Sequence, residues 1–81
     1  MREMAAPRIT GYTRNRMRQR RIPEAVVVEV YDDPDGVYLS PAHHGPDREV
    51  RWRRYDGRVV EIVVDMTDDT IVSAWITRVD G

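Results

Sequence analysis

The 81-residue chain contains no cysteine, no lysine and no phenylalanine, and each absence narrows what the protein can be. Without cysteine, neither a disulfide nor a thiolate metal site can stabilise the fold. Without phenylalanine, the core must be built from Val, Ile, Met and Trp. All 13 basic residues are arginine. A G+C-rich genome would produce this bias, as would a need for planar donors that bind phosphate in pairs. Because the bias runs through the whole chain, it favours the genomic cause.

The chain also lacks long apolar runs. No segment approaches the roughly 20 apolar residues of a membrane span, and the N-terminus, MREMAAPR, has no apolar segment typical of a signal peptide. Hydrophobic residues nevertheless make up 41% of the chain, which is ordinary for a globular protein. We therefore expect a single cytoplasmic domain over residues 1–81, with a flexible N-terminus at 1–8, two helices within 10–33 and a sheet within 37–78.

Charge is distributed unevenly along the chain. Residues 1–22 carry seven Arg and one Glu, giving +6, and residues 23–81 carry six Arg and thirteen acids, giving −7. The stretch TGYTRNRMRQRRIP, at residues 10–23, holds five of these arginines. Charge this concentrated indicates contact with a polyanion or an acidic protein surface.

A first helix is expected from a Thr10 cap to about Arg21. At 100° per residue, its arginines separate into two groups. The solvent side of the helix should carry Arg14, Arg18 and Arg21. The packed side should carry Arg16 and Arg20, together with Ile9, Thr13 and, nearby, Tyr12. The packed arginines can serve either chemistry or structural ion pairs.

A second helix is expected after Ile22-Pro23-Glu24, since proline suits a first turn and an acid there complements the helix dipole. The four valines that follow have strand propensity, but Ile22, Val26 and Val30 have helical spacing. Three strands should follow at 48–54, 58–65 and 70–78, with a possible fourth at 37–42. These elements predict an α+β fold, with two N-terminal helices on a 3–4-stranded antiparallel sheet.

The turn at Tyr55-Asp56-Gly57 sets the register of the first strand pair. A two-residue Asp-Gly loop would place Trp52 opposite Glu61 and mix charge with core on both faces. A three-residue loop places Trp52 opposite Val60 and gives one apolar face. We therefore expect the three-residue loop. The second face would then hold Val59, Val63, Arg51, Arg53 and Glu61. The last strand should be apolar on both sides, with Ile71 and Trp75 on one side and Val72, Ala74 and Ile76 on the other. A surface of this kind favours a protein partner or a homodimer.

Two segments resemble the domain of unknown function 4258 family: YTRNRMRQRRIPE at 12–24, and VRWRRYDGRVVEIVVD at 50–65 followed by IVSAW at 71–75. The family typically reads His-Ala-x-x-Arg-Met-x-x-Arg-Gly-Ile-Ser at the first segment. It is similar to the BrnT and RelE-like toxins. The resemblance implies a metal-independent endoribonuclease or translation inhibitor of a toxin–antitoxin system, neutralised by an antitoxin. Two positions depart from the family pattern: Tyr12 stands at the histidine and Arg21 at the glycine.

Metal-free RNA cleavage needs a proton acceptor, a cation at the phosphorane and a proton donor. The cation candidates are Arg16, Arg20 and Arg53, and Tyr12 and Tyr55 can position the substrate. The acid–base candidate is His43, which lies beside His44 in the turn-like stretch SPAHHGPD. The RNA-binding candidates are Arg14, Arg18, Arg21, Arg51 and Tyr55.

No cofactor or metal ligand set is expected, because adjacent histidines lack spaced carboxylates and the aspartates at 32–35 resemble a helix stop and turn. Two alternatives to the ribonuclease hypothesis stay open. One is a non-catalytic RNA- or protein-binding module, which the Tyr12 substitution favours. The other is a structural protein that assembles through the apolar face of its sheet.

Overall fold

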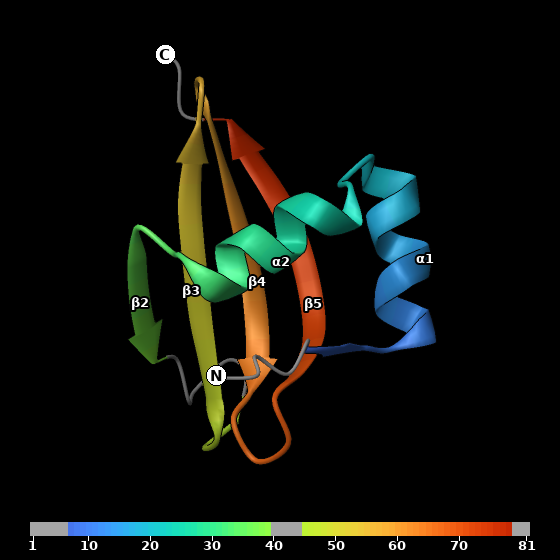
Figure 1. Cartoon of the computed structure of the whole chain (residues 1–81), viewed down its shortest axis with the longest axis vertical. Coiled ribbons are helices and arrows are strands. Elements are labelled where there is room, and N and C mark those ends of the chain that lie inside the picture. The colour runs from blue at the N-terminus through green and yellow to red at the C-terminus, as the bar shows by residue number, and fades with distance from the viewer. Residues whose placement is uncertain (1–6, 40–44, 79–81) are drawn as a thin grey trace, which may run out of the picture.

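The computed structural model describes residues 7–39 and 45–78 and shows an α+β fold with two helices and one sheet (Figure 1). Its elements are β1 (Arg8–Ile9), α1 (Gly11–Arg20), α2 (Glu24–Asp32), β2 (Gly36–Leu39), β3 (Arg48–Tyr55), β4 (Arg58–Asp65) and β5 (Thr70–Arg78). The α+β class and the two N-terminal helices are confirmed. The predicted 3–4-stranded antiparallel sheet is wrong in strand number and in strand direction, because the described residues form a mixed sheet of five strands.

The strands lie in the order β1-β5-β4-β3-β2. The pairs of β2, β3, β4 and β5 are antiparallel, whereas β1 pairs in parallel with the start of β5. The predicted flexible N-terminus is wrong at Arg8, because Arg8 belongs to β1 and pairs with Thr70 of β5. A two-residue strand carries too little periodicity to be recognised in a sequence.

The first helix begins and ends where its capping residues predict. The Thr10 side chain accepts a 3.1 Å hydrogen bond from the Thr13 N–H. At the other end, the Arg21 N–H bonds the Arg18 carbonyl and the Ile22 N–H bonds the Met17 carbonyl. This pattern is a Schellman motif, and it requires Arg21 to take a left-handed conformation, with φ 57° and ψ 46°.

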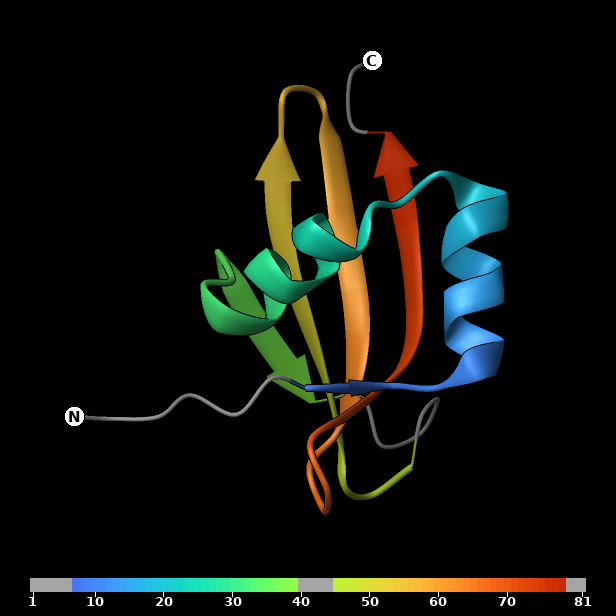
Figure 2. The same ribbon diagram turned by 45° about the vertical axis from the view of Figure 1, so that its right-hand side comes forward.

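The valine-rich segment is a helix, as its spacing predicts. In α2, Val27 and Val30 are fully buried and Val26 packs against the same cluster. This helix lies across β3 and β4, while α1 packs along β5 at the side of the sheet (Figure 2). The core between the helices and the sheet consists of Met17, Ile22, Val27, Val30, Val60, Ile62, Val64, Ile71 and Ala74.

The predicted register of the β3–β4 hairpin is wrong. Trp52 lies opposite Glu61, Arg53 opposite Val60, and Tyr55 opposite Arg58, so the loop is the two-residue Asp56-Gly57. Both loop residues have positive φ, 38° and 84°, as a type I′ turn requires. The expectation of one wholly apolar face fails because arginines on the helix-covered face bind backbone carbonyls of α2, as described below.

The register change moves side chains between faces. Arg51 and Arg53 lie on the helix-covered face, and Trp52 lies on the other face with Glu61. The predicted faces of the last strand are also wrong, because a bulge at Val63 and Val64 of β4 shifts the pairing with β5. The bulge places Ile71 in the core with Ala74 rather than beside Trp75.

The fourth predicted strand is present as β2, which pairs with β3 at the edge of the sheet. The predicted continuation at 40–42, and the histidines at 43 and 44, lie outside the described residues. In residues 7–39 and 45–78, no helix is long and apolar enough to cross a membrane.

Candidate nucleic-acid interface

The predicted packed side of α1 is confirmed for Thr13 and wrong for Tyr12 and Arg20, which are exposed. Thr13 is fully buried and Met17 is 4% exposed, so these two residues hold α1 against the domain. Arg14, Arg18 and Arg21 are exposed. Packing therefore fixes these guanidinium groups on one surface of the protein.

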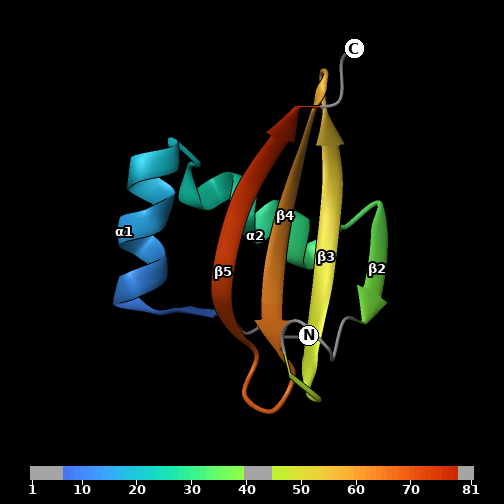
Figure 3. The ribbon, with the colours of Figure 1, turned by 180° about the vertical axis from the view of Figure 1, so that it is seen from behind.

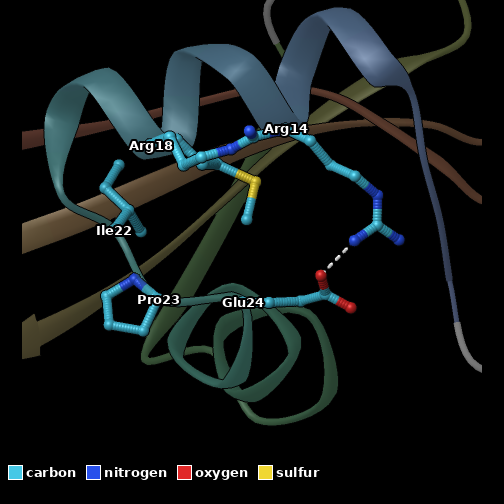
Figure 4. Close-up of a pocket in the computed structure, with 6 residues that line it drawn as sticks. Arg14, Arg18, Ile22, Pro23 and Glu24 are labelled. Carbon is cyan, nitrogen blue, oxygen red and sulfur yellow. Dashed lines mark hydrogen bonds and ion pairs between the residues drawn. The ribbon is translucent and has the colours of Figure 1, made fainter.

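The exposed arginines differ in their partners. Arg14 forms an ion pair with Glu24 at the start of α2, and the two side chains point toward one another across a shallow pocket that Arg18 also lines (Figure 4). Within the described residues, the side chains of Arg18 and Arg21 have no ion pair or hydrogen bond. These two side chains can therefore bind a ligand without first losing a protein partner.

Arg16 and Tyr12 form a second feature of α1. The Arg16 guanidinium lies 5.6 Å from the centre of the Tyr12 ring, within the range of a cation–π contact. Tyr12 is 67% exposed, which is unusual for an aromatic side chain. Together they place a flat ring and a planar cation on α1, the helix that also carries Arg14 and Arg18.

Arg20 is exposed, but its guanidinium binds the sheet. Its Nη1 donates a 2.7 Å hydrogen bond to the Ala74 carbonyl oxygen of β5. Because β1 pairs only with Thr70 and Ile71, the edge of β5 beyond Ile71 has no strand beside it in the described part of the chain. The Arg20 guanidinium satisfies one carbonyl on that edge.

Two arginines of β3 bind the C-terminal end of α2. Arg51 donates to the Tyr31 carbonyl at 2.7 Å and lies 4.5 Å from the centre of the Tyr31 ring. Arg53 donates to the Asp33 carbonyl at 2.6 Å and to its carboxylate at 3.1 Å. These contacts satisfy carbonyls that a helix end leaves unpaired and place positive charge at the negative end of the helix dipole.

Tyr55 is also engaged with α2. Its hydroxyl donates a 2.6 Å hydrogen bond to Glu29. Burial, and then this hydrogen bond, raises the pKa of Tyr55 to about 12, so the phenol stays protonated at neutral pH. The side chain therefore orients α2 over the sheet.

The five catalytic candidates are not assembled in one place by the described structure. Tyr12, Arg16 and Arg20 belong to α1 beside β5, Arg53 lies under the end of α2, and His43 is outside the described residues. Among the RNA-binding candidates, the three exposed arginines of α1 share a surface, whereas Arg51 and Tyr55 bind α2. Within the described residues, three exposed arginines are grouped on and beside α1, and Arg53 lies apart from the other catalytic candidates.

A second group of polar and aromatic side chains was missed by the sequence analysis. Tyr38, Trp52, Arg54, Val59 and Glu61 line a shallow pocket on the face of the sheet away from the helices. The Asp56-Gly57 turn carried the signal for this group, because a two-residue loop places Trp52 opposite Glu61.

In residues 7–39 and 45–78, no group of three or more His, Asp or Glu side chains is placed to hold a metal ion. Comparisons of the chain with protein-family models, with curated proteins and with solved structures give no match.

Proposed function

We propose that the protein is an RNA-binding module whose primary contact surface is the exposed side of α1. The observation that carries this proposal is the pair Arg18 and Arg21, which are exposed and have no side-chain partner among the described residues. Phosphate is a natural partner for such groups, since the guanidinium fork matches phosphate oxygens in pairs. Arg14 adds a third cation on the same side.

The exposed Tyr12 favours RNA with unpaired bases. Every base has an aromatic face, and single-stranded RNA presents that face for stacking on tyrosine or on an arginine plane. Tyr12 and Arg16 offer both groups on the same helix as Arg14 and Arg18. The resemblance to the RelE-like and BrnT toxins also supports RNA as the ligand.

Binding without cleavage fits the described side chains best. Arg20 and Arg53 already bind carbonyl oxygens of the fold, and Tyr12 stands where the family pattern has a histidine. We therefore place the protein among the non-catalytic relatives of toxin-type ribonucleases.

The proposal is tested by fluorescence anisotropy with a labelled single-stranded RNA at several salt concentrations. The Arg18→Gln/Arg21→Gln variant should bind more weakly than the parent. The slope of log affinity against log salt should fall in magnitude by about 1.4, because each lost phosphate contact on a single strand removes about 0.7.

A matched control is Arg58→Gln/Arg78→Gln, which removes the same charge from two exposed residues that lie opposite each other on β4 and β5. This control should bind almost as tightly as the parent. Equal weakening by both double variants would show that only net charge matters and would contradict a site on α1.

The same incubation tests the activity that the resemblance implies. If the parent shortens RNA in the presence of EDTA and a folded Arg16→Ala variant leaves it intact, metal-independent ribonuclease activity would be assigned to α1. Intact RNA bound by the parent is the result that we expect.

A second candidate function, binding of a partner protein, is favoured by β2. Val37, Tyr38 and Leu39 of this edge strand are 49%, 46% and 68% exposed. An exposed apolar edge strand accepts a further strand from another chain, which fits an antitoxin or a second copy. Light scattering of the parent against Leu39→Glu tests whether this edge associates.

A further inference from the structure

The face of the sheet away from the helices carries the most distinctive side chains outside α1. In Figure 3 the strands lie in front of α2, and no described helix covers this face. Across the middle of the face, Trp52 of β3, Glu61 of β4 and Trp75 of β5 are direct neighbours in register. Arg54 and Val59 form the next pair. We call this surface the open face.

Trp52 is held in a defined position by a glycine. A Cβ atom added at Gly36 would overlap the Trp52 ring at Cε2, Cζ2 and Nε1, so the indole lies directly against the backbone of β2. Gly36 also lies opposite Trp52 in the β2–β3 register. The absence of a side chain at Gly36 therefore fixes the ring as a preorganised flat surface beside Glu61.

Glu61 is oriented by Tyr38 and keeps acceptor capacity. The Tyr38 hydroxyl donates to Glu61 Oε1 at 3.1 Å. Burial and the nearby Glu61 raise the pKa of Tyr38, so the phenol stays protonated and continues to donate. A carboxylate offers about four acceptor positions, and the Tyr38 hydroxyl occupies one of them.

Arg54 supplies a cation at the edge of the same pocket. Its backbone N–H bonds the Asp35 carboxylate at 2.8 Å, which fixes the position of the residue. Its guanidinium is exposed and has no ion pair among the described residues. The pocket thus combines an aromatic surface, a carboxylate and a cation.

We propose that the open face binds an unpaired guanine of RNA, with the base stacked on Trp52, its N1–H and N2–H donating to Glu61, and a neighbouring phosphate contacting Arg54. This inference deepens the proposed RNA-binding function and rests on it. It adds a base preference that the arginines of α1 do not supply, because phosphate contacts carry no sequence information.

Guanine is selected by the geometry of its donors. Its Watson–Crick edge presents two adjacent N–H donors, which match the two oxygens of one carboxylate. Adenine and cytosine each present one amino group beside a ring acceptor that would repel the carboxylate, and uracil presents one N–H between two carbonyl groups. A centrally placed carboxylate next to a stacking surface therefore favours guanine over the other three bases.

The experiment compares two single-stranded probes, an oligouridylate with one central guanine and the same oligonucleotide with inosine in its place. Inosine keeps the N1–H but lacks the N2 amino group, so its stacking is similar and one hydrogen bond is lost. We expect the parent to bind the guanine probe about tenfold more tightly, within the range of discrimination given by paired base contacts.

Tryptophan fluorescence locates the binding. The chain has two tryptophans, Trp52 and Trp75, and the register places both on the open face. Stacking of the guanine probe should change this fluorescence, and an oligouridylate without guanine should change it less at equal occupancy.

The Glu61→Gln variant separates the carboxylate from the fold. It should lose the preference for guanine over inosine while binding oligouridylate as the parent does, with an unchanged circular dichroism spectrum. Arg54→Gln should weaken both probes equally and keep the preference, because it alters only the phosphate contact. Both substitutions are at side chains outside the core cluster, so each variant is expected to fold.

Failure of this inference can be told apart from failure of the proposed function. RNA binding with equal affinity for the two probes would overturn the guanine site and leave RNA binding by α1 in place. No binding of any RNA would overturn both. A dimer whose formation changes tryptophan fluorescence and excludes RNA would assign the open face to a second copy of the chain, and so would overturn the guanine site.

Discussion

Arg21 ends α1 in a conformation that favours glycine, and its replacement gives a sharp test of the described geometry. The residue has φ 57° and ψ 46° and donates its N–H to the Arg18 carbonyl in the Schellman motif. A side chain in the left-handed region costs about 1–2 kcal/mol. Glycine avoids that cost but loses about 0.5–1 kcal/mol through the greater entropy of its unfolded chain. The balance predicts that glycine at position 21 is more stable than alanine there by about 1 kcal/mol.

Comparing alanine with glycine at two positions removes the contribution of charge. Arg18 and Arg21 are both exposed arginines, and each pair of variants loses the same guanidinium. At position 18, inside α1, glycine should be less stable than alanine by about 1 kcal/mol. At position 21 the sign should be reversed. In a domain of this size, 1 kcal/mol corresponds to a shift in melting temperature of about 4–8 °C.

Urea denaturation of the four variants, Arg18→Ala, Arg18→Gly, Arg21→Ala and Arg21→Gly, measures both differences. The same sign at both positions would refute the left-handed assignment at Arg21. The Arg21→Gly variant also connects stability with function, because it should unfold at higher urea than the parent while binding RNA more weakly. Tighter RNA binding by this variant would contradict the proposed phosphate contact.

Three further predictions follow from the contacts of α2 and of the sheet. Arg51→Met should lower the free energy of unfolding in urea by about 1.5–3 kcal/mol, because it removes the bond to the end of α2 and leaves the half-buried Glu49 unpaired. Gly36→Ala should cost about 1–3 kcal/mol and change tryptophan emission, because the added methyl group displaces Trp52. Between pH 10 and about pH 12 the free energy of unfolding should fall, because the unfolded chain releases the Tyr55 proton near the ordinary pKa of 10.0 whereas the folded protein keeps it to about 12. The fall should be less steep in Tyr55→Phe.

Each of these predictions has its own control. Arg58→Met removes an exposed arginine of the same sheet and should change stability by less than about 0.5 kcal/mol, so an equal loss in both arginine variants would contradict the role of Arg51. An unchanged emission spectrum in Gly36→Ala would show that the indole does not lie on β2. Identical alkaline unfolding profiles in the parent and in Tyr55→Phe would show that the hydrogen bond to Glu29 does not raise the pKa of Tyr55.

Local signals in the sequence predicted the helices well. The Thr10 cap, the proline and acid at 23 and 24, and the spacing of apolar residues each act within a few positions of the chain. They gave the bounds of α1 to within one residue and identified the valine-rich segment as helix against its strand propensity. Helical geometry alone also predicted the exposure of Arg14, Arg18 and Arg21, but it wrongly assigned the exposed Arg20 to the packed group.

The hairpin register could not be obtained in the same way. One wholly apolar face would require charged side chains to avoid the helix-covered side of the sheet. Arg51 and Arg53 break that rule because their guanidinium groups reach the carbonyls of Tyr31 and Asp33. Those carbonyls become available only once α2 lies over β3, which is a property of the tertiary structure.

The open face was missed for the same reason. With the three-residue loop, Trp52 is assigned to the core and Glu61 is paired with Arg51. The two-residue turn reverses the faces of β3, because successive side chains in a strand point to opposite sides. A difference of one residue in loop length thus separates a predicted apolar surface from a pocket lined by Trp52, Glu61 and Arg54.

The sequence by itself determined the α+β class, the two helices, the position of the hairpin turn and the concentration of positive charge on α1, because each depends on residues close together in the chain. Only the tertiary structure decided which arginines are engaged and which remain exposed without partners, and which strand face carries Trp52 and Glu61. Those outcomes depend on pairings such as Arg20 with Ala74 and Tyr38 with Glu61. Residues so far apart in the chain meet only when the sheet and helices pack together, so their contacts leave no local pattern to read.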